Sequence, residues 1–562
     1  MNDSACARHI AVLLALCVGV TACGDDSGSA ETDASTGTTG AATSRATDEP
    51  GSATQSTQPT QGSVGTGTTD TVTGSGSVDD TGTDSGAGTD TGAVVPSEFV
   101  VQLQAQPGIR GEQRVNFAVP LPQGQLNDAT QVTLHNQGEA LAVGLRGLSS
   151  YPDGSLRSVQ VQLDIDVGDG LSLDVSIGGA DGTSTLDLVP VAETLIVEDG
   201  TEGPRVWALL PAEWLSGSGV AGPLLPISEF SPAAMTAWGG VCDYETHGTD
   251  SFLPQADTRG PWLYDRGTVM ARGYAVTGAL DPLRSAYRES SLYRSTLTGS
   301  GADTGIGVPD ANDDLKYHYV QNLAIHYRLT GDERFAEGAV NVALKAAALW
   351  PSPGYAGGAD FWTERHAGFA LLAYVSAATV ADDPEPFLVL ADEAVAAYVD
   401  VQETYPEGFV ETESRCFAHH ADAHGEGYGY FGCSPWMSAI LADALQAYVT
   451  ERPGPGGDLA QDAIVKLGRS IAESGLDDSG KPYYWMGVDT PSDEVDSYNE
   501  HWGEPAYVVA MAAYYAQDGG ADLLATAQAL TQGMADNGTA PHIRSFNWQC
   551  RSAIATPYFM AR

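Results

Sequence analysis

The chain has 562 residues, and its 26 basic and 73 acidic side chains give it a formal net charge of −47 at pH 7. Such an excess of negative charge repels nucleic acids and anionic membrane surfaces, so neither is expected as a partner. The length exceeds what one hydrophobic core usually supports, and the sequence therefore predicts several domains.

The first element is the apolar run HIAVLLALCVGVTAC, which is too short to span a bilayer and ends in small residues before Cys23. Its last four residues, Val20 to Cys23, resemble the lipobox of bacterial lipoproteins. The resemblance implies a signal peptide over residues 1–22, lipidation of the Cys23 thiol, and a membrane anchor made of acyl chains alone. It also implies export to the cell envelope, at the outer membrane or the cell surface. The alternative is an ordinary secretory signal followed by a chance cysteine.

Residues 23–95 contain Gly, Ser, Thr and Asp and almost no large apolar side chains. Such a segment cannot bury enough apolar surface to offset the entropy lost on ordering, so a disordered tether is predicted. Its acidic side chains repel one another and would keep it extended.

Residues 96–205 alternate apolar and polar side chains in short runs such as RVNFAVPL and SVQVQLDIDV, which predicts an all-β domain. A tight turn is expected at Pro152-Asp153-Gly154. This turn and the preceding VNFAVPLPQGQL resemble the N-terminal β domain of the exo-acting rhamnogalacturonan lyase family. Tyr151 and Ser158 stand where that family is expected to have tryptophan. The resemblance covers roughly 100 residues and implies polysaccharide cleavage, but none of these residues is plainly catalytic.

Residues 206–562 form the last predicted domain, where the periodicity becomes helical from about Gly260. Apolar helices end at five tyrosines, and each is followed by a second helix: Tyr274, Tyr327, Tyr374, Tyr448 and Tyr515. We expect an α/α toroid of about five to six helical hairpins whose inner helices form a closed ring. An α-solenoid is the alternative. A toroid with an appended β domain resembles several polysaccharide lyase and glycoside hydrolase families.

Four cysteines follow the lipobox, and an even number in an exported chain predicts two disulfides. Three pairings are possible. We favour Cys416 with Cys433, which closes a local loop, and Cys242 with Cys550, which ties the start of the helical domain to its end.

The chemistry-bearing side chains gather in six segments, each leading into the first helix of a hairpin or into the last helix. These leading segments are residues 242–252, 309–319, 357–366, 413–436, 496–505 and 541–548. In a toroid they all emerge at one end and would form a bowl suited to a sugar chain, because aromatic rings stack on pyranoses and polar groups bind hydroxyls. The expected substrate-binding residues are Trp362, Tyr317, His318, Tyr430, Trp436, Trp502 and Arg544.

A lyase acting on an acidic glycan needs a base, a group that neutralises the uronate carboxylate, and an acid for the leaving oxygen. We expect His420 or His366 as the base, a tyrosine such as Tyr428 as the acid, and Arg365 or Arg544 on the carboxylate. Substituting His420 should then cost activity and leave the fold intact. The candidates for the chemistry are His420, His366, Arg365, Tyr428, His501 and Glu364.

Two other functions remain open at this stage. An inverting glycoside hydrolase needs a protonated carboxylic acid and a second carboxylate across the sugar. The carboxylates placed to supply such a pair are Glu364, Asp422, Glu426, Glu500 and Glu504. A non-catalytic glycan-binding protein needs neither set. In each case we expect a monomer with a polysaccharide or oligosaccharide as its ligand.

No cofactor is expected to be required. His420 and His424 are four residues apart, but the glycine-rich stretch around them disfavours a helix that would place both on zinc. If a metal is bound, calcium on the acidic loops is favoured over zinc.

Overall fold

The computed structural model describes residues 97–179, 185–350, 363–408, 413–424, 428–488, 494–495 and 499–561. The predicted signal peptide, the lipidation site Cys23 and the predicted tether lie outside the described residues, as do Trp362 and Glu426. None of the helices that the structure describes has the length and apolar character needed to cross a bilayer.

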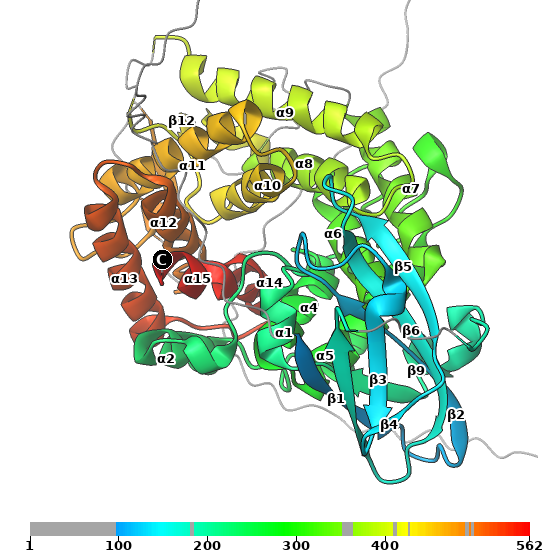
Figure 1. The fold of residues 1–562 in the computed structure, drawn as a ribbon. Helices are drawn as coiled ribbons and strands as arrows, with labels where there is room; N and C mark the ends of the chain where they lie inside the picture. Colours follow the sequence, from blue (N-terminus) through cyan, green and yellow to red (C-terminus); the bar gives the residue numbers. More distant parts are fainter. Residues whose placement is uncertain are drawn as a thin grey trace, which may run out of the picture. The chain divides into compact units, whose positions relative to one another are not determined.

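The β part contains a five-stranded sheet in the order β10-β1-β7-β3-β4, a three-stranded sheet in the order β2-β6-β5, and the β8-β9 hairpin (Figure 1). All strand pairs are antiparallel. The strands are β1 (Glu98–Ala105), β2 (Glu112–Pro120), β3 (Val132–Asn136), β4 (Glu139–Ala140), β5 (Gly144–Ser150), β6 (Leu156–Asp166), β7 (Leu171–Ile177), β8 (Leu195–Glu198), β9 (Thr201–Pro204) and β10 (Val206–Leu209). The predicted β structure is confirmed, and its last strand lies just beyond residue 205.

In strand β6 the alternation of apolar and polar side chains did not predict that both faces are buried. Val159 and Val161 point into the β core, as the period of two requires. Gln160 and Gln162 on the opposite face are also buried, because helix α6 (Val320–Thr330) packs against β2 and β6. The polar face of this sheet is therefore an interface with the helical part.

The helical part contains five hairpins, as the sequence predicted, followed by two further helices. In two hairpins the first helix ends at a glycine. Gly278 (φ 65°) and Gly331 (φ 72°) adopt the left-handed conformation, and their N–H groups donate to the carbonyl oxygens of Tyr274 and Tyr327. The hairpins are α4 (Arg266–Thr277) with α5 (Leu280–Thr296), α6 with α7 (Glu333–Leu349), α8 (Glu364–Ala378) with α9 (Glu385–Thr404), α10 (Ser438–Glu451) with α11 (Pro455–Ser474), and α12 (Gly503–Tyr515) with α13 (Gly520–Asn537).

The remaining elements are short. They are the helices α1 (Ala212–Gly217), α2 (Pro232–Val241), α3 (Thr249–Phe252), α14 (Ile543–Ser552) and α15 (Thr556–Met560), and the strands β11 (His419–His420), β12 (Phe431–Cys433), β13 (Tyr483–Gly487) and β14 (Glu494–Val495). The four short strands pair in the order β11-β12-β13-β14.

The first helices of the hairpins contact one another in series. Contacts run from α4 to α6, α8, α10, α12 and α14, and α14 in turn contacts α4. Every residue of α8 is buried, whereas α7 and α11 are buried along one face. The first helices are thus the inner set and the second helices the outer set.

A buried charge network joins these inner helices. Asp443 of α10 accepts hydrogen bonds from Arg272 of α4 at 2.8 Å, Arg551 of α14 at 2.7 Å and the Tyr507 hydroxyl of α12 at 3.0 Å. Arg551 also donates to Gln321 of α6, and its guanidinium lies 5.6 Å from the ring centre of a phenylalanine in α8. Burial opposes ionisation of Asp443, but the two arginines lower the pKa of its carboxyl group. The Asp443 carboxylate therefore binds side chains of three other inner helices, and Arg551 extends the network to the remaining two.

The two predicted disulfides are confirmed. Cys416 is bonded to Cys433 across a short loop, and Cys242 is bonded to Cys550 across 308 residues. The second bond connects the end of α2 to α14.

The turn that carries the family resemblance docks the β part onto the helices. Arg157 makes two hydrogen bonds to the Glu451 carboxylate at the end of α10, at 2.6 and 3.0 Å, and its guanidinium lies 4.2 Å above the Tyr151 ring. Ser158 Oγ lies 2.6 Å from the carbonyl oxygen of Arg328. The Ser158 hydroxyl thus reaches the end of α6 directly.

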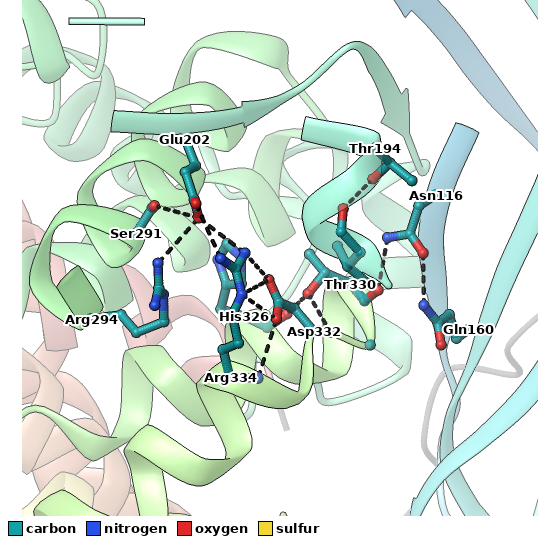
Figure 2. Close-up of polar contacts among 12 residues, drawn as sticks. Asn116, Gln160, Thr194, Glu202, Ser291, Arg294, His326, Thr330, Asp332 and Arg334 are labelled. Carbon is teal, nitrogen blue, oxygen red and sulfur yellow. Dashed lines mark hydrogen bonds and ion pairs between the residues drawn. The ribbon is translucent and has the colours of Figure 1, made fainter. Parts of the chain in front are cut away.

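A second group of polar contacts joins the same two parts (Figure 2). Asn116 of β2 donates to the carbonyl oxygen of Thr330 at 2.8 Å. Glu202 of β9 accepts from Arg294 at 3.2 Å and from Arg334 at 3.0 Å. The β part is held by specific hydrogen bonds as well as by apolar packing.

Replacing Arg157 with lysine should lower the free energy of unfolding by about 1–3 kcal/mol, because an ammonium group cannot reproduce the two-pronged contact with Glu451. Urea unfolding measures this. The matched control is Arg114→Lys, which alters a two-pronged but more exposed pair with Asp164 and should cost less than about 1 kcal/mol. Equal losses would contradict a special role for the buried pair.

Candidate functional site

The start of helix α8 directs three consecutive side chains toward two neighbouring segments. Glu364, Arg365 and His366 are all buried, and successive helical residues point about 100° apart. Their partners are His419 and Trp436 in one leading segment and Asp314 in another. Three leading segments thus meet at the start of α8.

Glu364 forms a buried pair with His419. One carboxyl oxygen accepts the Ser434 N–H at 2.9 Å, and the other lies 3.2 Å from His419 Nδ1. Burial raises the pKa of Glu364 to about 8, so its carboxyl group keeps a proton at neutral pH. The ring of His419 packs edge-on against Trp485 with centroids 4.9 Å apart.

This raised pKa predicts how stability changes with pH. The folded state keeps the Glu364 proton up to about pH 8, whereas the unfolded state releases it near 4.5. Between these values the unfolded state binds fewer protons, so the unfolding free energy must fall as pH rises, by at most about 5 kcal/mol. Glu364→Gln should remove most of this slope. Urea unfolding at several pH values compares the two proteins, and parallel profiles would contradict the assignment.

His366 is held on both sides of its ring. Its Nδ1 lies 2.9 Å from Thr363 Oγ1, and its Nε2 lies 3.5 Å from an oxygen of Asp314. Burial lowers the pKa of His366 to about 4, so the ring is neutral at pH 7. A ring with both nitrogens engaged is better suited to fixing the start of α8 than to accepting a substrate proton.

Four aromatic side chains from different segments form what we call the aromatic cluster: Trp436, Tyr484, His501 and Trp548. Trp436 stacks on the His501 ring with centroids 4.4 Å apart and planes 20° from parallel. Trp548 lies 4.8 Å from His501 on centroids, and Tyr484 lies 5.5 Å from Trp436. The ring centres of Trp436, His501 and Trp548 thus form a triangle, in which His501 contacts both tryptophans and the tryptophans contact each other at 5.8 Å.

A carboxylate orients His501. Its Nδ1 lies 3.1 Å from Glu504 Oε1, one helical turn further along the chain at the start of α12. In the tautomer that donates from Nδ1 to the Glu504 oxygen, Nε2 carries the lone pair. This is the arrangement that prepares a histidine for general-base work.

Two arginines lie on the tryptophans of the aromatic cluster. The Arg365 guanidinium is 5.2 Å from the Trp436 ring centre, and the Arg544 guanidinium is 5.0 Å from the Trp548 ring centre. These are cation–π distances. Since Trp436 and Trp548 contact each other at 5.8 Å, both predicted carboxylate-binding arginines belong to one site.

The other predicted residues lie elsewhere. His420 is half-buried with its ring edge-on to Phe431, while Tyr428 and Tyr430 lie beside each other near Trp485. Trp502 was predicted to bind sugar, but its ring packs on the outer helix α13, where a Cβ on Gly533 would lie 2.1 Å from it. Two further predicted residues, Tyr317 and His318, are buried in structural positions, and so is Arg415 of the segment 413–436.

Those three residues have contacts that explain their burial. The Tyr317 carbonyl accepts from the Tyr293 hydroxyl at 2.8 Å, and His318 Nε2 lies 3.2 Å from the carbonyl oxygen of Asn312. Burial lowers the pKa of His318 to about 4. The Arg415 carbonyl accepts from Gln402, so this arginine sits beside the outer helix α9.

Sequence reasoning did not single out Tyr484, Trp548 or Tyr264. Trp548 ends the last leading segment, where its helical spacing from Arg544 was the available signal. Tyr484 lies in KPYYWMG, between two hairpins. Tyr264 precedes α4, and its ring centre is 6.1 Å from those of both Trp436 and Trp548.

Side-chain contacts link all six leading segments. His366 meets Asp314, Arg365 meets Trp436, and the aromatic cluster joins the segments of Trp436, His501 and Trp548. The remaining segment joins through His247, whose ring stacks on Phe546 at 4.8 Å. Within the part of the chain that the structure describes, no group of three or more His, Cys, Asp or Glu side chains could hold a metal ion.

The site therefore combines a carboxylate-oriented histidine, two arginines, stacked aromatic rings and a protonated carboxyl group. A scan against models of protein families finds no family that matches this chain, and a search among curated proteins finds no similar one.

Proposed function

We propose that this protein is a carbohydrate-active enzyme, and that it is a polysaccharide lyase cleaving a uronate-containing glycan by β-elimination. The observation that carries the proposal is the His501–Glu504 pair in contact with both Trp436 and Trp548. Such a pair supplies a base, and the flanking tryptophans supply ring faces of the kind on which pyranoses stack.

The two arginines are suited to binding the uronate carboxylate of the substrate. A uronate carboxylate must be neutralised before its α-proton becomes acidic enough to remove, and guanidinium groups bind carboxylates in two-pronged fashion. Arg365 and Arg544 are placed for this by Trp436 and Trp548. His501 then takes the α-proton, the carbon–carbon double bond forms, and the bond to the bridging oxygen on the β carbon breaks.

Access to this site requires movement. Trp436, His501 and Trp548 are between 1% and 7% exposed, so a sugar reaches His501 only when side chains above the cluster separate. Substrate binding should therefore change tryptophan fluorescence.

The architecture supports the same proposal. Contacts that pass through six inner helices and return to α4 fit an α/α toroid, and the bond between Cys242 and Cys550 joins its ends. An open solenoid would leave its first and last helices apart. The resemblance of the β part to the rhamnogalacturonan lyase-like domain supports a glycan as the substrate. The lipobox-like sequence at Cys23 supports a location at the cell envelope, with acyl chains as the anchor.

An inverting glycoside hydrolase is the second candidate, favoured by one observation. Glu364 is buried, and its pKa is raised to about 8, which is the property required of a general acid. Glu504 would be the second carboxylate. Its hydrogen bond to His501, however, commits it to orienting a base, which suits the lyase better.

The test is to incubate the purified protein with a panel of pectic, other uronate-containing and neutral polysaccharides. A lyase releases unsaturated uronates, which absorb ultraviolet light, whereas a hydrolase releases reducing ends without that absorbance. A change in tryptophan fluorescence without either product would identify a non-catalytic glycan-binding protein and overturn the proposal.

A further inference from the structure

Two consecutive non-glycine residues before α4 adopt a left-handed backbone. Tyr264 has φ 71° and Asp265 has φ 56°. This conformation costs roughly 1–2 kcal/mol for a residue with a side chain and is uncommon for a bulky one. Strain of this kind persists only where the surrounding structure fixes it, and it gathers at functional sites.

Three helices fix the strained pair. Asn547 of α14 donates to the carbonyl oxygens of Pro261 and Leu263, at 2.8 and 2.9 Å. Asn322 of α6 donates to the Asp265 carboxylate at 2.6 Å, and the Thr268 hydroxyl of α4 donates to its other oxygen at 2.7 Å. The backbone on both sides of Tyr264 is therefore held by side chains that are themselves buried.

The result of this arrangement is the position of the Tyr264 ring. Its centre is 6.1 Å from those of Trp436 and of Trp548, and both of these rings also contact His501. Tyr264 is 1% exposed. Tyr264 precedes α4 and His501 precedes α12. The phenol of Tyr264 and the imidazole of His501 thus contact the same two tryptophans.

We infer that Tyr264 is the proton donor of this site, an inference that rests on the proposed lyase function. His501 accepts the proton α to the uronate carboxyl group, the electron pair of that bond forms the new double bond, and the bond from the β carbon to the bridging oxygen breaks. The Tyr264 hydroxyl gives its proton to that oxygen. The proton on His501 then returns to the Tyr264 oxygen, so no redox partner is needed and the enzyme ends as it began.

This assignment replaces Tyr428 as the expected acid. Tyr428 packs beside Tyr430 and near Trp485, whose ring also contacts His419. Tyr264 shares two direct neighbours with His501. Acid and base must act on adjacent atoms of one sugar, so the residue closer to the base is the better donor.

The experiment compares Tyr264→Phe with Tyr274→Phe on the substrate that gives the most unsaturated product. Tyr264→Phe should lower kcat about 10²- to 10⁴-fold with little change in KM, because it keeps the ring and removes only the proton. Tyr274 is equally buried and lies in α4, the helix that follows Tyr264. Its hydroxyl accepts the Leu210 N–H, so Tyr274→Phe should lower stability and leave kcat unchanged.

A second readout separates proton donation from packing. A uronate carrying a nitrophenolate leaving group needs no proton, so it should restore most of the rate lost in Tyr264→Phe. Fluorotyrosine at position 264, which is nearly the size of tyrosine, should move the alkaline limb of the pH–rate profile to lower pH. This variant keeps the test valid if phenylalanine perturbs folding.

The outcomes distinguish the two proposals. Unsaturated product from the unmodified protein together with full kcat in Tyr264→Phe, no rescue by the better leaving group, or an unmoved alkaline limb would overturn the role of Tyr264 alone. Absence of unsaturated product from every substrate would overturn the lyase function and the Tyr264 role together.

Discussion

Replacing His501 with asparagine is expected to lower kcat for release of unsaturated uronates by about 10²- to 10⁴-fold, the usual contribution of a positioned general base. Asparagine keeps a polar side chain beside Glu504 but cannot accept the substrate proton. The ring that stacks on Trp436 and contacts Trp548 is also lost, so KM should rise. Initial rates by ultraviolet absorbance measure both parameters.

Two companion variants sharpen this test. Glu504→Gln keeps the size of the side chain and removes the charge that orients His501, so it should lower kcat less than His501→Asn and shift the pH–rate profile. His135→Asn, in strand β3 far from α12 in the chain, is the matched control and should leave kcat unchanged. If His420→Asn abolished turnover and His501→Asn did not, His420 would be the base, as one of the sequence-based alternatives states.

The largest loss of stability is expected from Asp443→Asn. The change leaves Arg272 and Arg551 buried without the carboxylate that both contact, and breaking a buried pair of this kind costs about 3–5 kcal/mol. Thermal and urea unfolding measure the loss. Because the arginines lower the pKa of Asp443, its stabilising effect is present above the unfolded pKa and is lost as the pH falls.

Asp392→Asn is the control for that variant. Asp392 accepts from Tyr448 and Arg452, but its side chain is 45% exposed, so its removal should cost about 1 kcal/mol or less. If the two variants lost the same stability, the six helices would not depend on the buried carboxylate.

Local patterns predicted the elements but not their surroundings. Alternation in SVQVQLDIDV and the glycine after Thr277 predicted a strand and a helix end, and both are present. Pattern could not show that Gln160 faces a helix, because that burial depends on contacts with residues far along the chain. For the same reason Asp443 read as one polar residue in an apolar helix, since Arg272 is 171 residues away.

The sequence could predict which segments form the site, but not the role of each residue in it. Four of the residues predicted from histidines and tryptophans before helices lie in one group of contacts, and their roles stay predictions: Arg365, Trp436, His501 and Arg544. Sequence could not rank His366 and His420 against His501, because only geometry shows which nitrogen a neighbour occupies. Tyr264 was missed because GPWLYDR contains no histidine and its left-handed backbone leaves no mark in composition.

The bond between Cys242 and Cys550 makes most of the helical part covalently circular. A single cut by a protease at any loop between these residues would leave the two fragments joined, so the inner helices could not drift apart by diffusion. Cys550 follows all five hairpins in the sequence, so the bond cannot form before these hairpins have been synthesised. Protection against a single proteolytic cut is therefore gained in one step, when this bond forms. A chain that stops before Cys550 would lack that protection.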